Sequence, residues 1–154
     1  MDYMVRKLQT SYPEAEFRVV VGMSSDKDLK LCGSSILKAV NGDSTRIHLV
    51  EAAHPRAAKL QDILEATSLN DANYNMDDPS PTTQIASAMR LAAKNKEILV
   101  ICGSVFLMAE AREALGFDEP RDSKYIAEVA GAGVRHGQEN FGNTTIPEFA
   151  SKQQ

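Results

Sequence analysis

The feature that most constrains this chain is a unit that recurs four times: an apolar, β-branched run, a short polar loop, and a segment with helical spacing. The apolar runs lie at residues 17–21, 46–50, 72–76 and 98–102, and the third is the weakest. Repeated strand–helix units favour a mostly parallel sheet with right-handed crossovers. We therefore predict an α/β fold of three layers, in which a mostly parallel sheet is flanked by helices.

Helical periodicity gives the expected positions of the helices. Apolar positions recur at helical spacing in residues 1–12 and 29–40. Two more helices are expected to begin at Pro55 and at Ser80-Pro81, because proline suits the first helical position. A last helix follows residues 103–104 and ends near Gly116. The run at 98–102 is continuously apolar, which is typical of a strand covered on both faces.

The chain is expected to divide into one domain and an extension. Residues 1–118 carry the α/β pattern, whereas 119–154 are Gly-rich and polar, with one short helix possible at 125–130. We predict that this extension is partly disordered. Because the pattern opens on a helix, whereas the later units each begin with a strand, we also expect that something upstream of the first helix is missing.

Composition excludes several classes of function. A formal charge of −4 gives no overall attraction to nucleic acid or anionic lipid. No apolar run approaches the roughly 20 residues that span a bilayer, and no signal peptide is recognisable. Both cysteines lie in apolar segments, where reduced core thiols are expected. These features predict a cytoplasmic protein without nucleic-acid or membrane partners, with a mitochondrial or plastid location left open.

Function is expected where the strands end. In parallel sheets ligands bind beyond the carboxyl ends of the strands, so the loops at 22–28, 51–56, 77–80 and 103–104 should share one rim. The polar and glycine residues of these loops are the candidate ligand-binding residues: Gly22, Ser24, Ser25, Asp26, Lys27, His54, Arg56 and Ser104. No catalytic residue and no metal site is predicted, because no nucleophile–base order or metal-ligand spacing occurs.

Each candidate has a chemical reason and a simpler alternative. Gly22 permits a tight turn, after which hydroxyls, helix-start amides and Lys27 are suited to hold an anion; alternatively, Ser25 or Asp26 only caps the next helix. Arg56 is suited to clamp a carboxylate or phosphate beside His54, unless both are merely solvated. Ser104 is either a second anion contact or part of a strand-to-helix turn.

Three stretches resemble the carboxy-terminal domain of folylpolyglutamate synthases and dihydrofolate synthases, which belong to the Mur ligase superfamily. They are Val-Val-Val-Gly-Met-Ser-Ser-Asp-Lys-Asp at 19–28, His-Pro-Arg-Ala at 54–57, and Ile-Leu-Val-Ile-Cys-Gly-Ser-Val-Phe-Leu-Met-Ala-Glu-Ala-Arg at 98–112. The order and spacing are those of the family, and the resemblance covers residues from about 5 to 118.

The resemblance implies a ligase of folate biosynthesis and one-carbon metabolism. In the family, ATP phosphorylates a folate or pteroate carboxylate, and the amine of L-glutamate attacks the acyl phosphate. Mg²⁺ and ATP are held mainly by an amino-terminal P-loop ATPase domain, whose motif this chain lacks. The resemblance therefore implies that the candidate residues position nucleotide and glutamate, and that the chain alone is inactive.

The family pattern also implies an additional first strand, followed by an Asp-Gly-Ala-His-Asn-Pro motif. Without that strand we expect marginal stability or self-association. Two alternatives remain. One is a stand-alone, non-catalytic α/β module that binds a small ligand or a protein, and the other is a Mur-type ligase domain for an amino acid other than glutamate.

Overall fold

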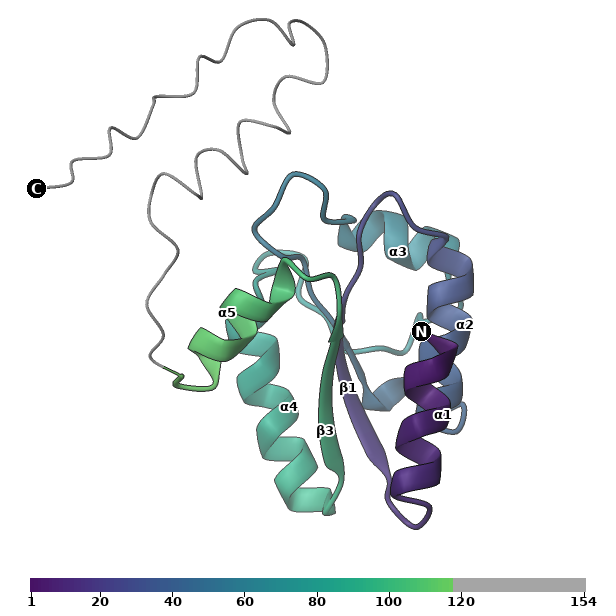
Figure 1. The fold of residues 1–154 in the computed structure, drawn as a ribbon. Coiled ribbons are helices and arrows are strands. Elements are labelled where there is room, and N and C mark those ends of the chain that lie inside the picture. Colours follow the sequence, from purple (N-terminus) through teal and green to yellow (C-terminus); the bar gives the residue numbers. More distant parts are fainter. Residues whose placement is uncertain (118–154) are drawn as a thin grey trace, which may run out of the picture. The chain divides into compact units, whose positions relative to one another are not determined.

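The computed structural model describes residues 1–117, which form a three-stranded parallel sheet with helices on both faces (Figure 1). The α/β class and the parallel sheet predicted from the sequence are thus confirmed, with one strand fewer than expected. The elements follow one another as α1 (Asp2–Ser11), β1 (Phe17–Gly22), α2 (Leu29–Ala39), a 3₁₀ turn (Ser44–Arg46), β2 (Ile47–Leu49), α3 (Leu60–Ala66), α4 (Pro81–Asn95), β3 (Ile98–Gly103) and α5 (Leu107–Ala114). The extension at 119–154 and its possible helix lie outside the described residues.

The sheet is built around β1. Its order is β2-β1-β3, with Val19 opposite both Ile47 and Val100. All six residues of β1 are buried, as expected for a central strand covered on both faces. Because all three strands are parallel, their carboxyl ends lie at the same end of the sheet.

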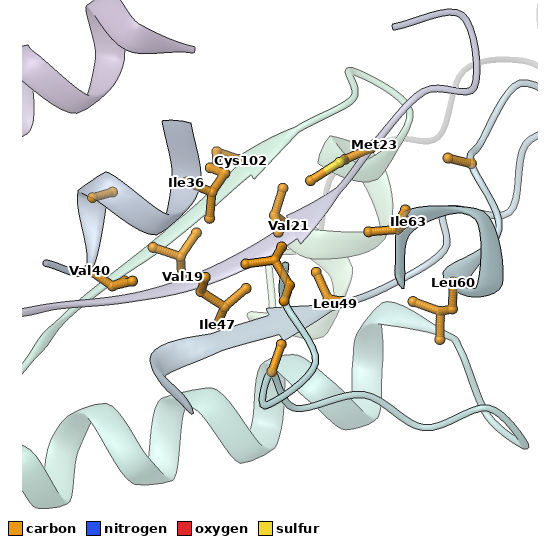
Figure 2. Close-up of a cluster of buried hydrophobic side chains, with 14 of the residues drawn as sticks. Val19, Val21, Met23, Ile36, Val40, Ile47, Leu49, Leu60, Ile63 and Cys102 are labelled. Carbon is orange, nitrogen blue, oxygen red and sulfur yellow. The ribbon is translucent and has the colours of Figure 1, made fainter. Parts of the chain in front are cut away.

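Successive side chains of β1 point to opposite faces of the sheet, and the core is therefore divided into two halves. Val19 and Val21 point to the side of α2 and α3, where they pack with Ile36 and Ile63 (Figure 2). Val20 points to the opposite side, where it packs in a cluster with residues of α4 and α5. Figure 1 shows the same division, with α1, α2 and α3 on one side of the strands and α4 and α5 on the other.

The strand predicted at 72–76 does not form, and that prediction is wrong. Only Asn73 pairs with β2, through an isolated parallel bridge to His48. The Asn73 side chain donates to the carbonyl oxygens of Thr45 and Ile47, at 2.7 and 3.1 Å. A single asparagine thus covers the outer edge of β2 by main-chain and side-chain bonds.

The helix predicted from Pro55 begins five residues later, at Leu60. Residues 54–57 instead contact the loop after β1, where Ala57 forms an antiparallel bridge with Ser24. The start of α3 is stabilised by Glu51, whose carboxylate accepts hydrogen bonds from the Leu60 amide (2.8 Å) and the Lys59 ammonium (2.9 Å).

Strand β3 also differs from its prediction. It was expected to be covered on both faces, but Ile98, Leu99, Val100 and Ile101 are only half-buried. The reason is its position at the edge of the sheet, where, among residues 1–117, it pairs only with β1.

A buried polar network joins the elements at the amino ends of the strands. Arg18 of β1 pairs with Glu97, with Nε and Oε2 2.6 Å apart and both side chains less than a tenth exposed. His48 of β2 lies between Arg18 Nη1 (3.2 Å) and Gln84 Oε1 of α4 (3.0 Å). Because guanidinium only donates and amide oxygen only accepts, His48 is neutral with its proton on Nδ1.

Burial lowers the pKa of His48, and the nearby Arg18 adds to this effect.

Within residues 1–117 no helix is long and apolar enough to cross a membrane.

Candidate functional site

The loops after β1 and β2 are joined by main-chain hydrogen bonds at the carboxyl edge of the sheet. Ser24 and Ala57 form an antiparallel bridge. The Ser25 amide donates to the Arg56 carbonyl (2.8 Å), and the Ala58 amide donates to the Met23 carbonyl (2.9 Å). The two loops predicted to share a rim are therefore in direct contact.

The loop after β3 is attached to the same place. The Ser104 amide donates to the Gly22 carbonyl (2.8 Å), and the Ser24 hydroxyl donates to Ser104 Oγ at 3.0 Å. The fourth loop lies nearby, since the Glu51 amide donates to the Pro79 carbonyl (2.8 Å). The rim predicted from the strand pattern thus forms from all four loops.

Two glycines permit this close approach. Gly22 and Gly103 lie opposite each other in the pairing of β1 with β3. Gly103 has a φ of 119°, and a β-carbon there would lie 2.0 Å from the Gly22 carbonyl oxygen. No other residue fits at position 103 without moving the loop that presents Ser104.

A cavity of about 400 Å³ opens between these loops. Five of the eight candidate residues line it: Ser24, Asp26, Lys27, Arg56 and Ser104. Gly22, Ser25 and His54 form its support and do not line it. A larger cavity of about 630 Å³ lies between α2 and the end of α3, but it shares no residue with the rim.

Lys27 is a cationic side chain available to a ligand. Its side chain is exposed and makes no salt bridge or side-chain hydrogen bond within residues 1–117. Ser104 is buried, and its Oγ accepts from the Ser24 hydroxyl and from the Phe106 amide (3.3 Å). The hydroxyl proton of Ser104 is therefore available to donate into the cavity.

Arg56 and Asp26 are paired with each other. Their side chains lie 2.5 Å apart, and both are more than two-fifths exposed. This hydrogen bond to Arg56 holds the pKa of Asp26 below its usual value. The guanidinium predicted to clamp an anion thus already has a carboxylate partner.

His54 is stacked against Phe106. The ring centroids are 3.4 Å apart and the planes 6° from parallel. His54 Nδ1 accepts from the Arg56 amide (3.1 Å), and the Arg56 guanidinium lies 5.8 Å from the Phe106 ring centroid. Phe106 thus contacts both candidates from the loop after β2: it packs on His54 behind the cavity and lies beside Arg56 in its lining.

The cap of α2 is Asp28, which accepts from the Leu31 amide (2.8 Å). The alternative in which Ser25 or Asp26 only caps this helix is therefore wrong. Ser25 instead donates its hydroxyl to the Arg56 carbonyl (3.2 Å). The loop is available for contacts other than capping.

Sequence reasoning missed Phe106. Its ring lines the cavity, stacks on His54 and lies under Arg56. A phenylalanine just before a helix gives no periodic signal that distinguishes it from a core residue. Only the approach of the loops after β2 and β3 reveals its role.

Comparisons with protein families, with curated proteins and with solved structures find no match to this chain. In the described part of the chain, no three His, Cys, Asp or Glu side chains are grouped so as to hold a metal ion. What the rim can do must therefore be derived from its own geometry: it offers the Lys27 ammonium group and the Ser104 hydroxyl proton to a small anion.

Proposed function

We propose that this chain is the carboxy-terminal domain of a folylpolyglutamate or dihydrofolate synthase of the Mur-ligase type, and that its rim positions L-glutamate. The observation that carries the proposal is the meeting of Lys27 with the Ser24–Ser104 hydroxyl pair in one cavity. Two of the three stretches that resemble the family supply these groups.

The chemistry of the cavity suits a carboxylate, and we assign to it the side-chain carboxylate of L-glutamate. An exposed ammonium and a buried hydroxyl donor favour a carboxylate, and charge-assisted hydrogen bonds to it are stronger than neutral ones. In the ligase reaction the glutamate amine attacks an acyl phosphate, forms the amide bond and displaces phosphate. Holding the amine in line with the acyl carbon lowers the entropic cost of that step.

In this proposal the rim does not hold the magnesium ion. The described loops contain no group of three possible metal ligands, and the resemblance to the family implies that ATP and Mg²⁺ are held mainly by an amino-terminal P-loop domain. The sequence contains no P-loop motif, and we expect the chain alone to be inactive. Lys27, Ser24 and Ser104 would act by positioning and not by proton transfer.

The proposal predicts weak, charge-dependent binding of L-glutamate to the chain itself. We expect a dissociation constant of about 1 mM in an NMR titration, with shifts at Ser24, Lys27 and Ser104. Replacing Lys27 by alanine should weaken binding about fivefold, because one exposed ion pair contributes about 1 kcal/mol. Lys30→Ala is the matched control, since Lys30 lies on α2 beside the other cavity.

Two outcomes would contradict this assignment. One is equal binding of L-glutamate and L-glutamine, because glutamine lacks the second carboxylate. The other is equal weakening by Lys27→Ala and Lys30→Ala. Either result would show that binding does not depend on an ion pair between Lys27 and the side-chain carboxylate of glutamate.

Ligase function itself can be tested by joining the chain to the ATPase domain of a folylpolyglutamate synthase. We expect ATP-dependent addition of labelled glutamate to folate or pteroate, and strong loss of it on Lys27→Ala. A folded fusion that binds ATP but adds no glutamate would instead favour the second candidate, a non-catalytic binding module. That candidate is supported by the outer edge of β3, with which no segment of the described part of the chain pairs.

A further inference from the structure

The two edges of the sheet differ. On β2, the outer main-chain groups bond to Asn73: the Leu49 amide donates to the Asn73 carbonyl and the Asn73 amide donates to the Ile47 carbonyl, both at 2.8 Å. On β3, no described segment pairs with the outer edge, and Figure 1 draws no strand beyond it. Residues 1–117 therefore present one closed edge and one open edge.

The open edge has main-chain groups positioned for a further strand. The Ile98 amide donates to Glu16 and the Ser104 amide donates to Gly22, so the even-numbered residues of β3 face β1. Because hydrogen-bonding direction alternates along a strand, the amides and carbonyls of Leu99 and Ile101 face outward. Within the described residues these groups have no main-chain partner.

As far as residues 1–117 show, the open edge also lacks the features that normally prevent pairing. Strands at an edge are usually protected by lysine, proline, a bulge or a covering loop. The six residues of β3 contain no charge and no proline, and four of them are half-buried apolar side chains. An uncharged edge meets a copy of itself without electrostatic repulsion.

We propose that two copies of this chain pair through β3, antiparallel, about a two-fold axis perpendicular to the sheet. With Val100 on the axis, Leu99 of each copy lies opposite Ile101 of the other, and each such pair exchanges two hydrogen bonds. The two sheets then form one continuous six-stranded sheet. This inference does not depend on the proposed ligase function.

The closed edge of β2 determines the size of the assembly. Because Asn73 occupies that edge, a dimer formed through β3 has no second edge by which to grow, and a closed two-fold dimer results instead of a filament. A contact of six residues per chain buries less than the roughly 1,200 Å² of stable complexes, so we expect a dissociation constant of about 10–100 µM.

The test is sedimentation velocity from about 5 µM to about 500 µM, together with amide hydrogen exchange of the unmodified protein. We expect a monomer–dimer equilibrium in which Leu99 and Ile101 gain protection as concentration rises. A monomer throughout the range overturns the proposal. So does protection of these amides in the monomer, since a segment of the same chain would then cover the edge.

A variant tests whether this particular edge is used. Ile101→Pro removes an amide that faces outward, so the hydrogen bonds between β1 and β3 are kept. We expect it to weaken the dimer at least about tenfold, whereas the control Ile101→Val keeps the amide and changes the affinity less than about twofold. A dimer that is equally strong in Ile101→Pro overturns the proposal, and if that variant fails to fold, the exchange measurement decides.

Discussion

Gly103 is needed both for the backbone conformation of the loop after β3 and for the position of Ser104, because it packs directly against the Gly22 carbonyl. Its φ is 119°, and the position that a β-carbon would take lies 2.0 Å from the Gly22 oxygen, which leaves no room for a side chain. We expect Gly103→Ala to lower the free energy of unfolding by about 3 kcal/mol or to prevent folding, measured by urea denaturation.

Gly42 is the matched control for this prediction. It also has a positive φ, 85°, but a β-carbon there meets no atom within 4 Å. Gly42→Ala should therefore cost only the backbone strain, about 1 kcal/mol. Equal effects of the two substitutions would show that the contact with Gly22 is not what makes Gly103 necessary.

Between elements, the buried network of Arg18, Glu97, His48 and Gln84 makes stability depend on pH. The pKa of His48 is lowered in the folded protein by burial, whereas the unfolded chain keeps the ordinary value of about 6.5. As pH falls below that value the unfolded state binds a proton that the folded state does not. The stabilisation from neutral His48 is therefore complete above the unfolded pKa and is lost as pH falls toward the folded pKa.

Urea denaturation at pH 7.5 and pH 5.5 measures this effect. Each unit between the folded and unfolded pKa values of His48 corresponds to about 1.4 kcal/mol in the free energy of unfolding. We expect the folded protein to be less stable at the lower pH. His48→Asn should be less stable at both values but should lose most of the difference between them. If wild type and variant show the same pH dependence, another group is responsible.

The sequence predicts elements well where one local pattern decides them. The apolar runs at 17–21 and 98–102 locate β1 and β3 within a residue, and Ser80-Pro81 locates the start of α4. The start of α3 was missed because residues 54–57 bond to the loop after β1. A local sequence pattern cannot show that these residues bond to a loop about 30 positions away instead of beginning a helix.

The candidate site shows the same division. That the glycine and serine loops meet follows from parallel strands, so Ser24 and Ser104 were predictable as neighbours. The pairing of Arg56 with Asp26, 30 residues apart, was not, and neither was the stacking of His54 on Phe106. These contacts depend on side-chain directions that become definite only when the loops pack.

For the molecule as a whole, Cys102 reports on global opening. Burial raises the pKa of its thiol to about 12, so in the folded state it is un-ionised and unreactive near neutral pH. Cys32 is only partly buried and lines the rim cavity. We expect a thiol reagent at pH 8 to label Cys32 quickly and Cys102 only as the fold opens.

The Cys32→Ser variant isolates the slow reaction, and its rate should rise with urea in parallel with the loss of helical circular dichroism. Labelling of Cys102 as fast as a small-molecule thiol, in folded protein, would contradict its burial. Slow labelling would in turn provide a simple measure of opening for the glycine and histidine variants.

The polar network and the rim lie at opposite ends of the sheet, about 20 Å apart along the six residues of β1 or β3. One end contributes a largely buried polar anchor, and the other presents loops that are joined mainly by main-chain hydrogen bonds. Because of this separation, we expect side chains of the rim loops to be replaceable with little loss in the free energy of unfolding. The rim could thus be re-engineered for a different small anion while the anchor stays untouched.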